Sequence, residues 1–177
     1  MIELMRELDL PVHDQDCQQY LTFKLREDNY GMSIDSVKEI IPYGNVTAVP
    51  LMPGFVMGVL NLRGDVVPII DLSLRFGKAE TEIKPRSCIV ILDINFNQET
   101  VLLGFVVDSV TEVVDIHEQQ IEQPPTFGTK INSEFIHGII NVAGDLFILL
   151  QGDQVLSVDE MMSLIKNVIE KSVMGRV

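Results

Sequence analysis

The sequence is poor in the side chains that carry covalent and metal chemistry. It contains two cysteines, Cys17 and Cys88, and three histidines in 177 residues. The cysteines form no CxxC pair, and no Cys and His pair has the spacing of a zinc site. Neither a disulfide framework nor a structural metal is therefore expected. A reducing, cytoplasmic compartment fits this cysteine usage best.

Positive charge and long apolar runs are also scarce. Thirteen Lys and Arg residues face 26 Asp and Glu residues, which gives a formal net charge of -13 and an isoelectric point near 4.5. The negative electrostatic field of such a surface repels phosphate backbones and anionic lipid head groups, so nucleic acid and acidic membranes are poor partners. No stretch approaches the roughly 18 apolar residues of a membrane span, and we expect no direct membrane insertion.

An internal repeat is the most informative feature that is present. The segment GMSIDSVKEII (31–41) recurs as GFVVDSVTEVV (104–114), and FVMGVLNLRGDVVPII (55–70) recurs as FIHGIINVAGDLFILL (135–150). The offsets are 73 and 80 residues, so the second half has seven extra residues between its motifs. A loop absorbs such an insertion at little cost. Two ordered blocks that share Gly and Asp positions indicate a duplication.

Each half has the pattern of short strands separated by turns. Residues 20–25 and 88–94 are rich in β-branched and aromatic side chains, and they end in polar turns at 26–29 and 95–98. Five or so strands in each half, with turn signals at a spacing of about ten residues, predict small closed barrels rather than a parallel sheet with crossover helices. The expected fold is mainly β, with a second barrel over roughly residues 84–150.

Helices are expected in two places only. Asp71 is placed to cap a single helical turn that Gly77 ends. The C-terminal segment 157–177 begins with a capping box of Ser157 and Glu160. Its apolar residues recur at helical spacing: Val158, Met161, Met162, Ile165, Val168 and Ile169. This stripe fits packing onto a barrel, and a partner-binding helix is the alternative.

Catalytic motifs are not found. The glycines assemble neither GxGxxG nor GxxxxGK[ST], so no phosphate cradle is predicted. The acidic segment 108–118 contains His117 but matches no EF-hand loop and no HExxH motif, and a solvated acidic face explains it. His137 stands where Met57 stands in the first half, which favours a side chain at a strand edge over a general base. We expect no catalytic residue, metal or cofactor. An enzyme that uses the groove between the two barrels, with acidic residues and His117, is the alternative of another class.

The string GVLNLRGDVVPIIDL (58–72), preceded by VKEI (37–40) and VPLMP (49–53), resembles the signature of CheW-like domains. The similarity runs from about residue 19 to residue 156. It implies two five-stranded SH3-like barrels over 19–156, an N-terminal arm over 1–18 and a C-terminal helix over 157–177. The chain departs from the family pattern at the longer turn 95–100 and at Gln151, which stands where Asp71 stands in the first half.

The resemblance also implies a function without catalysis. CheW-like proteins are scaffolds that couple the cytoplasmic tip of a methyl-accepting chemoreceptor to the regulatory domain of the histidine kinase CheA, in arrays at the inner face of the membrane. An adaptor of a related kinase pathway, such as pilus-driven motility, is the alternative. The receptor- and kinase-binding residues of the family fall at Val37, Glu39, Gly58 and Arg63. A partner surface of the second barrel falls at Gly104, Val110 and Val113.

Arg63 stands out because the two halves differ there. Its counterpart in the second half is Ala143, whereas Glu39 keeps an acidic counterpart in Glu112. A barrel of this kind folds with alanine at that turn, so the architecture does not require the arginine. Arg63 is therefore a candidate either for partner contact or for an ion pair with Glu39, and the sequence leaves both open.

Overall fold

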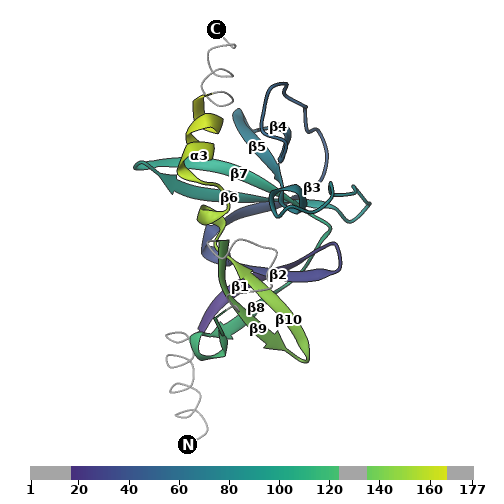
Figure 1. Ribbon diagram of the computed structural model, residues 1–177, viewed down its shortest axis with the longest axis vertical. Coiled ribbons are helices and arrows are strands. Elements are labelled where there is room, and N and C mark those ends of the chain that lie inside the picture. Colours follow the sequence, from purple (N-terminus) through teal and green to yellow (C-terminus); the bar gives the residue numbers. More distant parts are fainter. Residues whose placement is uncertain (1–16, 124–134, 167–177) are drawn as a thin grey trace, which may run out of the picture.

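The computed structural model describes residues 17–123 and 135–166. Within these residues the fold is mainly β, as predicted, and consists of two five-stranded mixed sheets with a short C-terminal helix (Figure 1). The strands are β1 (Cys17–Leu25), β2 (Asp28–Ser33), β3 (Val37–Pro42), β4 (Val56–Leu62), β5 (Asp65–Asp71), β6 (Cys88–Phe96), β7 (Glu99–Val107), β8 (Ser109–His117), β9 (Ile136–Val142) and β10 (Asp145–Leu150). The helices are α2 (Leu72–Arg75) and α3 (Val158–Leu164), with 3-10 turns η1 (Ile34–Ser36), η2 (Glu118–Gln120) and η4 (Gly152–Gln154).

The two sheets exchange hairpins between the halves of the chain. Sheet A has the strand order β8-β1-β2-β10-β9, and sheet B has the order β3-β6-β7-β5-β4. Strands β1 to β5 belong to the first repeat and β6 to β10 to the second, so each sheet joins the first hairpin of one half to the last three strands of the other. The prediction of a second barrel built only from residues of roughly 84–150 is therefore corrected, because each sheet contains strands of both halves. The two halves have similar sequences, so each first hairpin could pair with the last three strands of either half, and the sequence did not show which pairing occurs.

The repeat glycines occupy equivalent places in the two sheets. In sheet B, Ile69 of β5 lies opposite Gly104 of β7, and in sheet A, Leu149 of β10 lies opposite Gly31 of β2, both in parallel pairs. A Cβ atom at Gly104 would lie 2.6 Å from Cδ1 of Ile69, and one at Gly31 would lie 2.8 Å from Cδ2 of Leu149. In both sheets the glycine thus leaves room for an aliphatic side chain of the neighbouring strand. The matching surroundings support the inferred duplication.

Each sheet closes on itself through one small bridge. In sheet B, Thr47 and Val59 exchange two backbone hydrogen bonds of 2.9 and 2.8 Å. In sheet A, Glu122 and Ile139 exchange two of 2.8 Å. Val59 and Ile139 are equivalent residues of the repeat, and each follows an equivalent glycine. The chain that leaves one edge strand therefore reaches the opposite edge strand in both sheets, which is the barrel closure that the turn spacing predicted.

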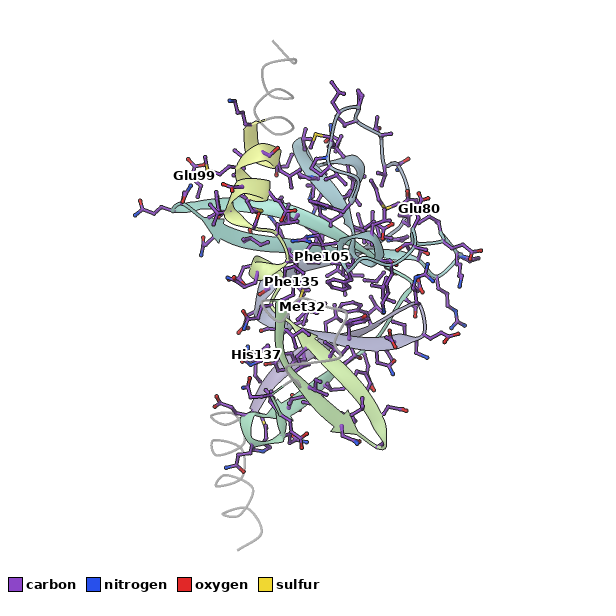
Figure 2. The ribbon with its side chains drawn as sticks, in the orientation of Figure 1. Met32, Glu80, Glu99, Phe105, Phe135 and His137 are labelled. Atoms are coloured by element: carbon purple, nitrogen blue, oxygen red, sulfur yellow. The ribbon has the colours of Figure 1, made fainter. Side chains whose placement is uncertain are left out.

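The largest hydrophobic cluster is shared by both sheets. Strand β6 is buried on both faces: Ile89 and Ile91 pack inside sheet B, whereas Val90 and Leu92 join a cluster that also receives β1, β2, α2 and α3. Met32, Phe105 and Phe135 of this shared cluster lie between the two sheets (Figure 2). Burial of apolar area contributes about 25 cal/mol per Å², so much of the stabilisation comes from contact between the sheets. A smaller cluster fills sheet A.

Both expected helix starts are confirmed. The buried Asp71 side chain accepts a hydrogen bond from the Leu74 amide at 3.3 Å and two from Thr81, at 2.9 and 2.6 Å. Ser157 and Glu160 form the capping box of α3, with hydrogen bonds of 3.1 and 2.8 Å. The expected C-terminal part of that helix, including Val168 and Ile169, lies outside the described residues, as do residues 1–16 of the expected arm. No helix among the described residues has the length and hydrophobicity to cross a bilayer.

The hairpin of β6 and β7 is longer than predicted. Strand β6 continues through Asn95 and Phe96, which pair with Thr100 and Glu99, and the turn is reduced to Asn97 and Gln98. In the equivalent β1–β2 hairpin the last pair is Leu25 with Asp28, which corresponds to Ile94 with Val101. The second hairpin is thus extended by the pairs Asn95–Thr100 and Phe96–Glu99. The polar residues of 95–98 hid this extension, because polar side chains fit a strand exposed on both faces as well as a turn.

Candidate partner-binding surface

Strands β3 and β8 are equivalent edge strands of sheets B and A. Along β3, half-buried residues alternate with exposed ones, and Ile40 is 40% exposed. Its counterpart on β8, Val113, is 46% exposed. Each sheet therefore displays one large aliphatic side chain on an edge strand. The sequence prediction missed Ile40, although the alternation of β3 placed it on the outer face.

The turn that carries Arg63 does not depend on an arginine. Arg63 and Gly64 have φ values of 50° and 94°, and Ala143 and Gly144 have 52° and 91°, the two positive φ values of a type I′ hairpin turn. In both turns the glycine amide donates a hydrogen bond of 3.0 Å to the side-chain oxygen of an asparagine, Asn61 in the first turn and Asn141 in the second. The backbones match, so the side chain of Arg63 is free to serve another purpose.

Arg63 and Glu39 form an ion pair across the seam of sheet B. Nη2 of Arg63 donates to Oε1 of Glu39, which joins the β4–β5 turn to the edge strand β3. The Arg63 side chain is 70% exposed and that of Glu39 is 25% exposed. An ion pair this exposed contributes about 0–1 kcal/mol to stability. The pair orients the guanidinium, and most of its surface stays available to a partner.

Val37 and Gly58, the other two residues predicted in the first half, are half-buried and buried. Val37 begins β3, is half-buried and packs against the shared cluster. Gly58 is buried in β4, where a Cβ atom would overlap the carbonyl oxygen of Thr47 in the closing bridge. Gly58 therefore supports the surface from inside, whereas Glu39 and Arg63 form its exposed part.

The three residues expected on the second barrel do not come together. Gly104 is buried in β7 of sheet B against Ile69 and Ile89, so it presents no surface to a partner. Val110 and Val113 lie on β8 of sheet A, where Val110 is half-buried against the shared cluster. The hairpin exchange causes this separation, because β7 and β8 are adjacent in the chain but belong to different sheets. Among these three, only Val113 is well exposed.

The acidic segment of β8 does not form a metal centre. Within residues 17–123 and 135–166, no three His, Cys, Asp or Glu side chains are arranged to hold a metal ion. Glu112 and Asp115 are exposed to solvent, and Oδ2 of Asp108 accepts a hydrogen bond of 2.6 Å from the Arg26 amide. His137 is exposed on β9, with Nδ1 3.3 Å from Nε2 of Gln151.

Comparison with known proteins assigns the family. A model of the CheW-like domain matches residues 19–160. The chemotaxis protein CheW of Klebsiella aerogenes is 36% identical over 151 residues, which are 85% of this chain and 88% of that protein. The chemotaxis protein CheW of Treponema pallidum is 31% identical over 159 residues, which are 90% and 93% of the two chains.

A solved structure shows the same fold. The crystal structure of the scaffolding protein TtCheW from Thermoanaerobacter tengcongensis is similar with a TM-score of 0.72 at 33% identity, covering 81% of this chain and 90% of that chain. The family match, the identities and the paired sheets agree. The chain belongs to the CheW-like domain family, whose members are non-catalytic scaffold proteins of chemotaxis.

Proposed function

We propose that this protein couples the cytoplasmic tip of a chemoreceptor to the regulatory domain of a CheA-type histidine kinase, in the cytoplasm at receptor arrays on the inner face of the membrane. Binding alone performs this function. The protein holds the receptor and the kinase in a fixed relation, so that a change in the receptor alters the phosphorylation rate of the kinase.

One observation supports the proposal most directly, namely the Arg63–Glu39 pair. The pair contributes little to folding, the equivalent turn of sheet A has Ala143 in place of the arginine, and the guanidinium is mostly exposed. Arginine presents five donors in a planar fork, which suits the recognition of carboxylate groups on a protein partner. A residue that folding does not need, in an ordered and exposed position, fits a role in recognition.

Apolar side chains on the edge strands would supply the rest of the contact. Ile40 is exposed on the face of β3 opposite to Glu39, and Val113 with the half-buried Val110 offers a second apolar strip on β8. The charged pair would orient the partner while the aliphatic side chains contribute buried area. Two partners can then bind one protein because the two sheets present separate edge strands.

Substitution of Arg63 tests the proposal. Arg63→Ala should weaken co-sedimentation with a receptor fragment and CheA at least tenfold, a change of about 1.4 kcal/mol, and lower the receptor-dependent phosphorylation rate. The melting temperature should fall by no more than about 2–4 °C, because a 1 kcal/mol change has that effect in a chain of this size. The matched control is Arg86→Ala, since Arg86 is also exposed. A large loss of melting temperature with unaltered complex formation would contradict the proposal.

A further inference from the structure

Helix α3 carries two apolar stripes, and only one of them is buried along its whole length. Met161 and Leu164 are 3% and 1% exposed and belong to the shared cluster. Val158 and Met162 are 65% and 51% exposed, and with Ile165 they follow the i, i+4, i+7 spacing of one helix face. Ile165 is half-buried against the shared cluster, so the C-terminal stripe that the sequence predicted is divided, and Val158 and Met162 remain exposed.

Met162 and Ile165 of the second stripe form one wall of a groove. A cavity of about 650 Å³ lies between α3 and the tip of the β6–β7 hairpin, lined by Met162, Ile165, Phe96 and Glu99 among others. An adjoining hollow of about 300 Å³ shares Ile165 and Glu99. We call the larger cavity the α3–hairpin groove. The β6–β7 hairpin projects past α3 (Figure 1), and Glu99 lies near its tip (Figure 2).

Sheet A has no counterpart of this groove among the described residues. The wall opposite α3 consists of the hairpin extension at residues 95–100, and the equivalent β1–β2 hairpin ends two residue pairs earlier. Helix α3 also has no counterpart in the first half, because the equivalent residues lie within 77–87, a segment after α2 that contains no helix or strand. Neither feature is needed to build a sheet of this kind. The groove is therefore an addition to the duplicated fold, at the hairpin that is longer than its equivalent in the first half.

The groove has apolar walls and an acidic rim. Phe96 and Met162 lie on its two walls, and methionine is common at surfaces that accommodate helices because its side chain is flexible and polarisable. Glu99 and Asp159 are exposed at the rim, against one cation, Lys166, among the described lining residues. The net charge of -13 adds to this negative field, which attracts basic partners.

We propose that the α3–hairpin groove binds an amphipathic helix of a partner protein, with Leu or Met anchors on Phe96 and Met162 and with Lys or Arg residues facing Glu99 and Asp159. This is the helix-in-groove mode of recognition, read at i, i+3, i+4 and i+7 positions. The described lining of the groove contains no residue of the edge strands β3 and β8, although the adjoining hollow reaches Lys38 of β3 and Gly64, which follows Arg63.

A labelled peptide provides the test on the full-length protein. The probe is a fluorescein-labelled helix of Leu and Lys with one apolar face, about 18 residues and so about 27 Å long, measured by fluorescence anisotropy. Met162→Glu should weaken its binding at least tenfold. Leu146→Glu, which alters a 62% exposed aliphatic residue on the β9–β10 hairpin, should change it less than twofold. Thermal melts should show both variants folded.

The rim is tested by charge. Glu99→Lys should weaken the same peptide about tenfold at low salt and less at high salt, while Glu112→Lys on the exposed face of β8 should have little effect. A Leu and Glu version of the peptide should bind at least tenfold more weakly than the Leu and Lys version. Equal effects of Met162→Glu and Leu146→Glu, or equal binding of the two peptides, would overturn the proposal.

Two other occupants are distinguished by the same experiment. If Val168→Glu raised the peptide affinity more than tenfold, the C-terminal residues of this chain would be the natural occupant, and the proposal of a partner helix would be wrong. If sedimentation showed a dimer that Met162→Glu dissociates, the occupant would be a second copy, and the proposal would again be wrong. Tenfold loss of peptide binding by a monomeric protein, specific to Met162 and Glu99, supports it.

Discussion

The guanidinium of Arg75 lies against the ring of Phe135, with its Cζ atom 4.7 Å from the ring centroid. The same Cζ atom is 5.4 Å from the centroid of Phe55, and Phe55 and Phe135 are equivalent residues of the repeat. Nε of Arg75 donates to the carbonyl oxygen of Val155 at 3.0 Å, and Val155 is the counterpart of Arg75 itself. Nη2 donates to Glu160 of α3 at 3.0 Å. One arginine thus joins both repeats and the C-terminal helix.

Replacing Arg75 should therefore destabilise the whole molecule. In Arg75→Lys the positive charge remains, but the planar group that stacks on the rings and donates to two acceptors is lost. We expect the free energy of unfolding to fall by about 2 kcal/mol, measured by urea denaturation. Arg86→Lys, at an exposed position, should change it by less than about 0.5 kcal/mol. A stability of Arg75→Lys equal to that of the parent would show that the arginine does not join the repeats energetically.

Gly58→Ala should reduce stability and partner binding together. The new Cβ atom would overlap the backbone of Thr47 and open the bridge that closes sheet B, so we expect a loss of about 3 kcal/mol. In a chain of this size such a loss lowers the melting temperature by about 6–12 °C. Gly44→Ala is the matched control, because a Cβ atom at that position would enter open space, more than 4 Å from the rest of the described chain. Normal melting of Gly58→Ala with lost binding would instead place Gly58 in direct partner contact.

Stability should fall at alkaline pH because of three groups near the sheets. Burial raises the pKa of Tyr30 above 10.0, with Lys78 opposing and Asp28 reinforcing the shift. Burial and the charge of Glu118 raise the pKa of Tyr20. Burial by itself lowers the pKa of Lys78, but the hydrogen bond to Asp28 and the proximity of Tyr30 outweigh it, and the net shift is upward from 10.5.

The sign of these three shifts is the same. Above about pH 10 the unfolded chain loses protons that the folded chain retains, so the free energy of unfolding decreases as the pH rises. Urea denaturation should show no contribution from these groups below about pH 9 and a decline above about pH 10. The Tyr30 hydroxyl is buried, with no hydrogen-bond partner of normal geometry among the described residues. Tyr30→Phe should thus be tolerated at neutral pH and make the alkaline decline shallower; an unchanged decline would contradict the assignment to Tyr30.

Local patterns in the sequence predicted local structure well. The capping residues Asp71 and Ser157 begin helices where expected, because a side-chain oxygen beside free amides acts within one turn. The strands and the repeat followed from alternation and from glycines with the same spacing. The Arg63–Glu39 pair was one of two open alternatives, since a sequence does not show whether two charged residues of neighbouring elements meet.

Contacts and strand pairings between residues far apart in the chain could not be predicted from local patterns. Arg75 gave no signal, because its partners Phe135 and Val155 lie far along the chain and meet it only when the two halves pack together. The positions of Gly104 and Val113 in different sheets depend on the hairpin exchange. Both arrangements satisfy the same strand pattern, so the difference lies in packing between the sheets rather than in any local preference.

The hairpin exchange predicts that neither half of the chain folds alone. A cut between Glu82 and Ile83 falls in a segment without helix or strand, and each fragment then holds two strands of one sheet and three of the other. In sheet B the first fragment would lack β6 and β7, which lie between its remaining strands. We expect no cooperative thermal transition by circular dichroism from either fragment, and a restored transition on mixing them. Gly104→Leu in the second fragment should prevent the restoration, because the leucine would occupy the place of the Ile69 side chain. Cooperative melting of one fragment alone would show instead that a half can form its own closed sheet.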